Sequence, residues 1–529
     1  PCELETRIGV SPMSQLDWMK DAPHPIRSVL VANRGEIACR VLRACNEMGL
    51  ESIAIRSDAD YGALHTEVAD SVVHLEGKTL ADTYLNIESI IAAARSSGAD
   101  AIHPGYGFLS ERAAFARAVQ EAGIIWIGPP AEAIESMGDK VTARRRMMDA
   151  GVPVIPGQEI VDSDDEDQLI DALVAAATEV GYPLLLKASA GGGGKGMRAV
   201  HEPKNLQQEF LAARREAQTA FGDGTVYIER LLDGSRHIEV QVLADFHGNT
   251  VHLFERECSI QRRHQKVVEE APSPVLDVST RLAMGNAAVA AAAAVDYAGA
   301  GTVEFLLASD GSFYFLEMNT RLQVEHPVTE CITGVDLVEQ QIRVAAGLLL
   351  PFKQEDLTIR GHAIEVRIYA EDPSQGFLPA TGPLAVFRPP EGPGIRLDTG
   401  VREGDEARID FDPMLAKLIV QGSDRDHAIR RMASALSEFV VLGATTNIGF
   451  LSDVISHPAY HAGETDTSFI QRHYPGDWDP PAPSDELLLI AAAAEHLGLH
   501  RRNTAATVVE DLGRTTPNDP FYRLNRRYP

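Results

Sequence analysis

Cysteines and long apolar runs are scarce in this chain. Its 529 residues include only five cysteines, at positions 2, 39, 45, 258 and 331, and no two of them form a Cys-x-x-Cys pair. An odd number of cysteines at these spacings argues against a disulfide framework or a zinc site and is typical of a reducing cytosol. No apolar run approaches the ~18 residues of a membrane span, and the first residues do not show the basic and then apolar pattern of a secretory signal. We therefore expect a cytoplasmic protein without a membrane anchor.

Basic residues are also in short supply. The chain has 48 lysines and arginines against 76 acidic residues, which gives a formal net charge of −28 at pH 7. Binding to nucleic acid needs a basic face, so this class of partner is not expected. Such a charge mostly affects solubility and is not itself a functional clue. A site for an anion such as ATP must gather its own cations locally.

The length exceeds what one hydrophobic core can hold, and about three or four domains are expected. Residues 1–27 contain four prolines and show no periodicity, which predicts an extended lead-in. From residue 28, short apolar strands alternate with amphipathic helices, as in a parallel sheet with helices on both faces. The turn at 33–36 has one glycine and no G-x-G-x-x-G motif, so a dinucleotide-binding domain is not expected.

A glycine-rich loop over residues 188–196 joins two strand-like segments. Its glycines satisfy G-x-G-x-x-G, but a loop between two strands is the wrong context for a Rossmann turn. Lys195 is followed by Gly196 and not by Ser or Thr, which excludes a Walker loop. The remaining interpretation is a hairpin whose N–H groups close over phosphates, with Lys187 and Lys195 supplying charge. The alternative is a mere flexible linker, although four consecutive glycines are costly in entropy.

The segment 313–319 alternates as a strand and predicts that Phe315, Glu317 and Asn319 share one face with Phe313. Glu317 and Asn319 would then present oxygens in one direction, as Mg²⁺ requires. The strand-like segment 302–307 is the predicted hairpin partner, and it would bring Glu304 next to Glu317 and Asn319. Two buried carboxylates would repel each other and take up a proton unless a cation lay between them.

The loop after this strand holds Arg321, Gln323, Glu325 and His326. An anion-binding arginine and a candidate base therefore lie within a few residues of the predicted metal ligands. The alternative is a solvated hairpin end with incidental charges.

Two more segments are candidates for a nucleotide site. Residues 229–232 end a strand, where backbone groups could bind an adenine edge and a carboxylate could bind ribose. The charged run 255–270 could send Gln261, His264 and Lys266 toward a polyphosphate, the alternative being a solvated face.

A new region begins at Gly361, where many short strands and Pro-Gly turns indicate an α+β domain. Its first strand places Glu365, Arg367 and Tyr369 on one face. Arg367 is its strongest candidate for a functional residue, and the alternative is a salt bridge to a neighbouring glutamate.

Together these motifs closely resemble the biotin carboxylase family within the ATP-grasp enzymes. The matching pieces are Asn33-Arg-Gly-Glu-Ile-Ala, His103-Pro-Gly-Tyr-Gly-Phe-Leu-Ser-Glu, Met137-Gly-Asp-Lys, Lys187 with its glycine loop, Gln261-Arg-Arg-His-Gln-Lys-Val-Val-Glu-Glu-Ala-Pro, and Glu317 to Thr329. The resemblance runs almost continuously from Ser28 to Tyr474.

This resemblance implies a multidomain α/β and α+β fold. A Rossmann-like, pre-ATP-grasp domain would cover 28–138, and an ATP-grasp domain with a mobile glycine-rich lid at about 159–231 would cover 139–355. The C-terminal α+β biotin carboxylase domain would cover 360–474. Residues 475–529 would form a helix and a basic tail that docks on a partner.

The resemblance also implies the ligands of ATP and metal. The ATP site would consist of Lys140, Lys187, Gly193, Gly194, Glu229, Arg230, Leu231, Leu232, His237, Gln261 and His264. Glu304, Glu317 and Asn319 would hold Mg²⁺ or Mn²⁺, with two ions expected.

The same resemblance implies how bicarbonate and biotin would be bound. Lys266, Arg321, Gln323 and Val324 would position bicarbonate, and Glu325 would remove its proton. Arg367 would stabilise the enolate-like oxygen of biotin, and Tyr106 would line the biotin pocket.

Three features depart from the family's pattern. Arg112 follows Glu111 where an asparagine is common, and residues 408–412 stand where two tyrosines are frequent. The chain has no Met-Lys-Met segment that could carry biotin, so biotin is expected on another chain.

The implied activity is that of the biotin carboxylase subunit of an acyl-CoA carboxylase of the acetyl-, propionyl- or methylcrotonyl-CoA type. The expected partners are a biotin carboxyl carrier protein or domain and a carboxyltransferase subunit, in a homodimer or a larger hetero-oligomer. The alternatives are the same subunit of pyruvate carboxylase, another ATP-grasp ligase that forms an acyl phosphate for an amine, and a non-catalytic nucleotide-sensing subunit.

Overall fold

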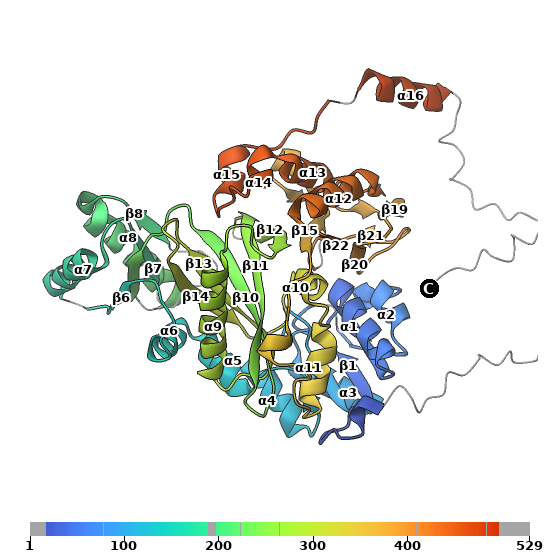
Figure 1. Cartoon of the computed structure of the whole chain (residues 1–529), viewed down its shortest axis with the longest axis horizontal. Coiled ribbons are helices and arrows are strands. Elements are labelled where there is room, and N and C mark those ends of the chain that lie inside the picture. Colours follow the sequence, from blue (N-terminus) through green and yellow to red (C-terminus); the bar gives the residue numbers. More distant parts are fainter. Residues whose placement is uncertain are drawn as a thin grey trace, which may run out of the picture. The chain divides into compact units, whose positions relative to one another are not determined.

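The computed structural model describes residues 17–77, 79–163, 165–188, 197–222, 224–263, 265–408, 411–482 and 484–496 (Figure 1). These residues belong to two units, one that ends at Trp478 and one that begins at Asp479. In the second unit the described element is helix α16 (Asp485–His496). Among the described residues, no helix is both long and apolar enough to span a membrane.

The first unit begins with a parallel sheet, as the alternation of strands and helices predicts. Five strands pair in the order β3-β2-β1-β4-β5, and every pair is parallel. The strands are β1 (Ser28–Val31), β2 (Glu51–Arg56), β3 (Ser71–His74), β4 (Ala101–His103) and β5 (Ile125–Trp126). The helices are η1 (Asp17–Met19), α1 (Gly35–Glu47), η2 (Asp58–Asp60), α2 (Leu64–Val68), α3 (Ile87–Ser97), α4 (Ala113–Glu121), α5 (Ala131–Gly138) and α6 (Lys140–Asp149). Strand β1 is buried along its whole length, as expected where helices cover both faces of a sheet.

A second sheet has a hydrophobic core of its own. It contains β6 (Gly157–Ile160), β7 (Leu184–Ala188), β8 (Arg198–Val200) and β9 (Val226–Arg230), in the antiparallel order β6-β9-β7-β8. Helices α7 (Glu166–Val180), η3 (Pro203–Asn205) and α8 (Leu206–Phe221) accompany it. Leu173 of α7 and Phe210 of α8 are fully buried in a cluster made only of residues from this part of the chain. Figure 1 shows these elements gathered at one side of the unit, and we call them the lid lobe.

The largest sheet connects the middle of the chain with its C-terminal part. Eight strands pair in the order β14-β13-β10-β11-β12-β15-β22-β20. They are β10 (Arg236–Ala244), β11 (Thr250–Arg262), β12 (Gln265–Ala271), β13 (Gly299–Leu307), β14 (Phe313–Asn319), β15 (His362–Tyr369), β20 (Ile395–Thr399) and β22 (Met414–Gly422). Because β12 pairs directly with β15, the two predicted regions on either side of residue 360 share one continuous sheet.

Helices and short ribbons complete the first unit. The helices are α9 (Val278–Ala293), α10 (His326–Thr333), α11 (Leu337–Ala345), η4 (Gln354–Asp356), η5 (Pro373–Gln375), α12 (Arg425–Glu438), α13 (Ile448–Ser456), α14 (Pro458–His461) and α15 (Phe469–His473). The ribbons pair β16 (Glu371–Asp372) with β17 (Leu378–Pro379), β18 (Gly382–Pro383) with β21 (Glu406–Ala407), and β19 (Val386–Arg388) with β23 (Val440–Leu442).

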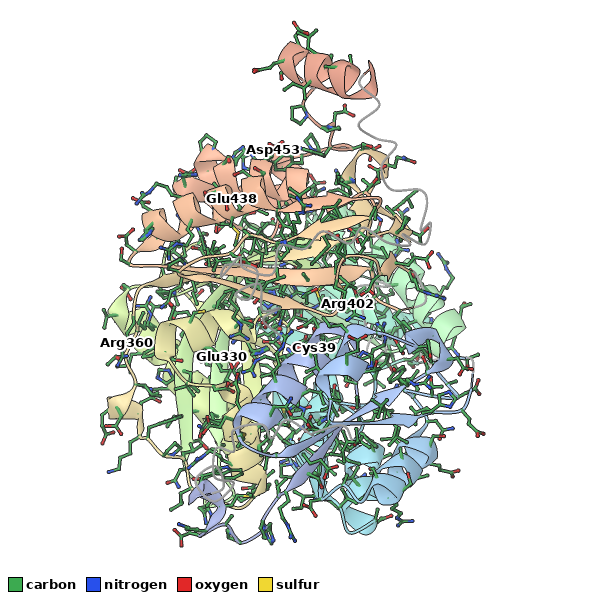
Figure 2. The ribbon with its side chains drawn as sticks, turned by 90° about the vertical axis from the view of Figure 1, so that its right-hand side faces the viewer. Cys39, Glu330, Arg360, Arg402, Glu438 and Asp453 are labelled. Carbon is green, nitrogen blue, oxygen red and sulfur yellow. The ribbon has the colours of Figure 1, made fainter. Side chains whose placement is uncertain are left out.

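Ion pairs connect the parallel sheet with the C-terminal part. Arg40 of α1 pairs with Glu330 of α10 at 2.9 Å, and Glu330 also pairs with Arg396 of β20 at 2.8 Å. Glu330 and Cys39, the neighbour of Arg40 in the chain, are labelled in Figure 2. Arg402, labelled there as well, pairs with Glu67 of α2. The first network connects α1 through Glu330 of α10 to β20, and the second connects α2 to the segment that follows β20.

A β-bulge changes which side chains of β14 share a face. Glu304 lies opposite Glu317 and Phe305 lies opposite Phe315, so Leu316 is an extra residue in the ladder. A bulge of this kind reverses the alternation of side chains. Phe315 and Met318 therefore both point into the core, and Asn319 reaches Glu304 on the other side. The prediction that Phe313 and Phe315 share a face with Glu317 and Asn319 is wrong for this reason.

Because the lid lobe has a separate core, we expect Phe210→Ala to unfold it locally. Removing a buried phenylalanine ring costs about 3–5 kcal/mol, more than a small lobe can lose without opening. Hydrogen exchange followed by mass spectrometry should show faster exchange in the peptides of the lid lobe and unchanged exchange in β10 and β13. Phe305→Ala, in the core under the large sheet, is the matched control and should affect β10 and β13 instead. Equal changes in both regions for both variants would contradict a separately stabilised lobe.

Candidate active site

A lysine whose side chain is 12% exposed lies at the centre of a cluster of carboxylates. Lys266 on β12 binds Glu304 of β13 at 2.9 Å, Glu325 at the start of α10 at 2.7 Å, and Glu239 of β10. Burial alone would lower the pKa of Lys266, but the three carboxylates together raise it well above its ordinary value. The lysine is therefore a fixed cation where three acidic side chains converge.

Glu325 is held between two cations. Its second oxygen pairs with Arg367 of β15 at 2.9 Å, and the same guanidinium donates through Nε to Glu269 of β12 at 2.7 Å. Burial raises the pKa of Glu325, but Lys266, Arg367 and Arg256 outweigh it and hold this pKa well below its ordinary value. Glu325 is thus ionised, which is the state required of a general base. Arg367 makes the salt bridge of the alternative prediction, and it makes that bridge to the candidate base itself.

Arg256 of β11 holds the surrounding groups in place, and the sequence reasoning missed it. It is fully buried. Its guanidinium donates to Glu239, to Gln241 at 2.8 Å, to Thr329 at 3.0 Å, to Thr302 at 3.1 Å and to Gln323 at 2.5 Å. These contacts connect β10, β13, α10 and the loop before α10. No local signal marks it, because the charged residues Glu255 and Glu257 on either side make Arg256 look like part of a solvated face.

The predicted metal ligands Glu304, Glu317 and Asn319 lie on two paired strands. One oxygen of Glu304 accepts N–H groups of Lys266 at 2.9 Å, Asn319 at 2.8 Å and Gln323 at 2.8 Å. Glu317 lies opposite Glu304 in the ladder and is exposed. Two carboxylates and an amide oxygen are hard donors, and an exposed carboxylate leaves room for water and phosphate oxygens. The donor set therefore fits Mg²⁺ or Mn²⁺.

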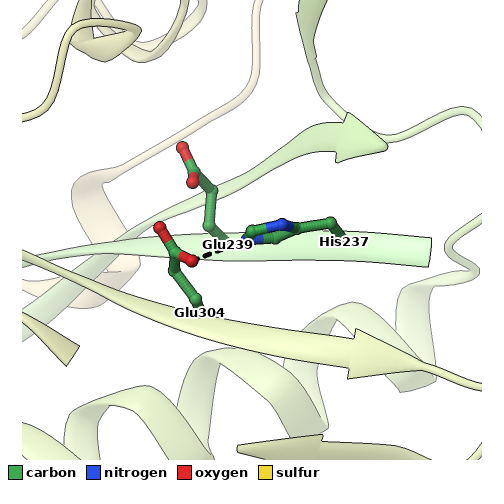
Figure 3. Close-up of side chains that lie close together, drawn as sticks. All are labelled: His237, Glu239 and Glu304. Carbon is green, nitrogen blue, oxygen red and sulfur yellow. Dashed lines mark ion pairs between the residues drawn. The ribbon is translucent and has the colours of Figure 1, made fainter. Parts of the chain in front are cut away.

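His237 contacts the other oxygen of Glu304 at 2.7 Å (Figure 3). Ligand atoms of His237, Glu239 and Glu304 all lie within 4.8 Å of one another, close enough to share a metal ion. Burial lowers the pKa of His237, but Glu304 outweighs it and the net shift is upward. The imidazole can donate to an anion when it is protonated and can ligate a metal ion when it is neutral, so both roles are open to His237.

A cavity of about 720 Å³ opens beside this cluster. Among the residues predicted to bind ATP, its walls contain Lys187, Glu229, Arg230, Leu231, Leu232, His237 and Gln261. Lys187 pairs with Glu229 across β7 and β9. The volume suits a nucleotide, and the cavity reaches from the lid lobe to the side of the carboxylate cluster that carries His237.

The strand end at residues 229–232 is only partly free to bind a base. The N–H of Arg230 donates to Pro156 at 2.9 Å and that of Leu231 donates to Pro183 at 2.8 Å. Backbone contacts to an adenine edge must therefore use the carbonyls or the N–H of Leu232.

The far wall of the cavity comes from segments that the sequence reasoning missed. Phe377, with a positive φ of 62°, has the guanidinium of Arg262 over its ring at 4.0 Å. Gln471 of α15 and Tyr474 lie on the same wall. No local pattern marks them, because they reach the cavity only through the packing of the C-terminal part.

Arg321 connects the loop after β14 with the first sheet. It pairs with Glu111 at 2.9 Å and donates to the side-chain oxygen of Asn319 at 2.9 Å. Arg112, the first departure from the family's pattern, is the residue before α4, and no described contact connects it to the site.

The second departure supplies an aromatic ring. Phe411 lies under the guanidinium of Arg34 at 3.8 Å and contacts Tyr84 edge-on. Residues 409 and 410 lie outside the described residues.

Tyr106, predicted to line the biotin pocket, donates its hydroxyl to Glu36.

Several predictions fall on residues that the structure does not describe. These are residues 1–16, the glycine loop with Gly193, Gly194 and Lys195, His264, and the basic tail after residue 496. Lys140 begins α6, but its side chain is outside the described part.

The stability of the protein should depend on pH through Glu325. Its pKa in the folded protein lies below the ordinary value of 4.5, so its contribution is present above that pH and is lost as the pH falls. Glu325→Gln should therefore destabilise the protein by about 3 kcal/mol at pH 7, and the difference from the parent should shrink toward pH 4. Thermal unfolding midpoints across this range provide the measurement.

Glu257→Gln is the matched control with the opposite sign. Burial raises the pKa of Glu257 to about 7, so its ionised form costs stability as the pH rises from 4.5 toward 7. Relative to the parent, this variant should gain stability over that interval. A difference from the parent that does not change with pH in either variant would contradict the assignment of charges.

Three family models match the chain. The model described as "Biotin carboxylase, N-terminal domain" matches residues 25–134, "Carbamoyl-phosphate synthase L chain, ATP binding domain" matches 139–353, and "Biotin carboxylase C-terminal domain" matches 365–472.

Individual proteins match over most of the chain. The mitochondrial methylcrotonoyl-CoA carboxylase subunit alpha of Dictyostelium discoideum is 48% identical over 94% of this chain and 70% of its own length. The biotin carboxylase of Halalkalibacterium halodurans is 51% identical over 84% of this chain and 98% of its own length. A crystal structure of the biotin carboxylase domain dimer of Hydrogenobacter thermophilus 2-oxoglutarate carboxylase, with MgADP and bicarbonate, superposes with a TM-score of 0.80 at 45% identity. The superposition covers 87% of this chain and the whole of the Hydrogenobacter thermophilus chain.

Proposed function

The chain belongs to the biotin carboxylase family, and from this premise we propose that it carboxylates biotin with bicarbonate in a reaction driven by ATP. The observation that carries the proposal is Glu325, an ionised buried carboxylate held between Lys266 and Arg367 beside a nucleotide-sized cavity.

Glu325 is the base in this proposal. Bicarbonate is a poor nucleophile, and a carboxylate at hydrogen-bond distance helps it to attack the γ-phosphate of ATP. Lys266, which now contacts Glu325 at 2.7 Å, binds the bicarbonate anion together with Arg321, Gln323 and Val324. As the substrate draws Lys266 away, Glu325 loses a stabilising cation and becomes a stronger base.

ATP occupies the cavity beside the lid lobe. Its proposed ligands are Lys140, Lys187, Gly193, Gly194, Glu229, Arg230, Leu231, Leu232, His237, Gln261 and His264. Glu304, Glu317 and Asn319 would hold two divalent cations, Mg²⁺ or Mn²⁺. Divalent cations at this place would neutralise the charge of the phosphates. The lid closes before the reaction because the carboxyphosphate that forms decomposes in water.

Biotin binds on the other side of Glu325. Arg367 stabilises the enolate-like oxygen of biotin while the ring nitrogen of biotin attacks the carboxyl carbon of carboxyphosphate. Inorganic phosphate leaves and takes up the proton of that nitrogen, and Tyr106 lines the pocket. Arg367 can shift from Glu269 and Glu325 to this oxygen without leaving the cluster, because it already makes several contacts there.

The final acceptor is an acyl-CoA, with pyruvate as the second candidate. The match to methylcrotonoyl-CoA carboxylase subunit alpha supports the first choice. The biotin is carried by a carrier protein or domain, and a carboxyltransferase subunit completes the enzyme. We propose a homodimer or larger hetero-oligomer in the cytoplasm, where free thiols such as the buried Cys39, Cys45 and Cys258 remain reduced.

The domain limits follow the same proposal. The first domain covers 28–138, the ATP-grasp domain covers 139–355 with its lid at about 159–231, and the C-terminal domain covers 360–474. Residues 1–27 precede them as an extension, and 475–529 dock on a partner.

The proposed activity is tested by ATP hydrolysis with and without bicarbonate and free biotin. Turnover should require bicarbonate and rise when biotin is added. Hydrolysis stimulated by an amine acceptor and not by biotin would identify another ATP-grasp ligase. Nucleotide binding without hydrolysis would identify a regulatory subunit.

In the same assay, Glu325→Gln should keep the affinity for ATP and lose about 10²–10⁴-fold in biotin-dependent turnover, the usual contribution of a general base. The affinity is measured by calorimetry and the turnover by phosphate release. Glu257→Gln is the control, because Glu257 is an equally buried glutamate of β11 that contacts neither Lys266 nor Arg367 in the structure. Undiminished carboxylation in Glu325→Gln would remove the base assignment.

A further inference from the structure

Lys417 of β22 is a wholly buried lysine outside the predicted site. Its side chain has no exposed surface. The ammonium donates to the backbone carbonyl of Val324 at 2.8 Å and lies 3.3 Å from a carboxylate oxygen of Glu36 and 3.6 Å from one of Asp398. A buried charge without partners is strongly unfavourable, so these three groups hold the lysine in place.

Two of the three partners depend on Lys417 itself. Asp398 already accepts two hydrogen bonds from Arg396, at 2.9 and 2.8 Å. Within the described part of the chain, Lys417 is the cation that pairs with Glu36, and the second oxygen of Glu36 accepts the hydroxyl of Tyr106. Lys417 is therefore mainly the ion-pair partner of Glu36 and the hydrogen-bond donor to the Val324 carbonyl.

These contacts connect segments that are far apart in the chain. Glu36 belongs to α1 beside the parallel sheet, Val324 to the loop after β14, and Lys417 to β22, next to the edge strand β20 of the large sheet. Val324 immediately precedes Glu325, and Tyr106 lies on the side proposed for biotin. A line of contacts thus runs from Tyr106 through Glu36 and Lys417 to the peptide that carries the base.

We propose that Lys417 is a positioning residue that fixes the Val324–Glu325 peptide relative to Tyr106. The inference rests on the proposed function and adds to it a group that touches no substrate.

The need for such an anchor follows from the contacts of Glu325. Its side chain is held by Lys266 and Arg367, and both must turn toward bicarbonate and biotin during the reaction. The backbone must then keep the carboxylate in place. Lys417 can do so, because its contact is to a backbone carbonyl and Lys417 is not one of the cations that the proposed reaction turns toward the substrates. A displacement of about 1 Å at a reacting group can cost 10²-fold in rate.

The test uses two double variants of the full chain, Lys417→Met/Glu36→Gln and Lys417→Gln/Glu36→Gln. Each replaces the ion pair with neutral side chains of similar volume, a change that buried pairs often tolerate. Neither can reach the Val324 carbonyl as lysine does, because methionine has no donor and glutamine is one bond shorter. We measure the KM for bicarbonate, kcat, the affinity for ATP and the thermal unfolding midpoint.

The expected result is an unchanged affinity for ATP with the KM for bicarbonate raised, or kcat lowered, by roughly 10- to 100-fold. Arg281→Met is the matched control. Arg281 also holds a buried carboxylate, Glu255 at 2.9 Å, and a backbone carbonyl, Leu276 at 3.2 Å. Its loss should lower the unfolding midpoint and leave both kinetic constants within about threefold of the parent.

Parent-like kinetics in either folded double variant would overturn the proposal. Failure of both variants to fold would also overturn it, since a positioning role requires the fold to stand without the lysine. The parent rate is measured first, and a parent without bicarbonate-dependent turnover would refute the proposed function itself.

Discussion

The site depends on one electrostatic arrangement, an ammonium surrounded by carboxylates from three separate elements. These carboxylates are Glu239, Glu304 and Glu325, and the ammonium is that of Lys266. If the lysine were absent, the carboxylates would repel one another in a region with little water, and such groups take up protons. The ammonium of Lys266 pairs with all three carboxylates and holds them close together. Arg256 acts in the same way one layer deeper, where it satisfies the oxygens that Lys266 does not reach.

This arrangement makes the resting site a set of contacts that substrates must replace. Lys266, His237 and Arg367 are each paired with a carboxylate in the structure. Each is also the kind of cation that binds an anionic substrate. Replacing a carboxylate partner with a substrate anion costs less free energy than placing an unpaired charge in a site without water. The internal ion pairs therefore hold the cations in position before the substrate binds.

Much of this could be predicted from the sequence, because short-range patterns specify strands, helices and the residues at their ends. The parallel sheet follows from alternating segments, and Lys266, Glu304, Glu325 and Arg367 do lie together. The rest depends on pairings between distant segments. A strict two-residue alternation cannot predict the β-bulge at Leu316, because the extra residue appears only in the pairing of β13 with β14. The pairing of β12 with β15, and the position of Lys417 beside Val324, arise only when the C-terminal part folds onto the middle of the chain.

The pairing of β12 with β15 also limits how the enzyme can move. Lys266 and Arg367 come from neighbouring strands that pair from Val268 and Val366 onward, so a hinge that separated them would have to break this ladder. The sheet therefore sets the distance between these two cations, and an inhibitor that contacts both would have to match that distance. The movement that we propose for the lid lobe would leave this part of the sheet unchanged, because the lobe has a core of its own.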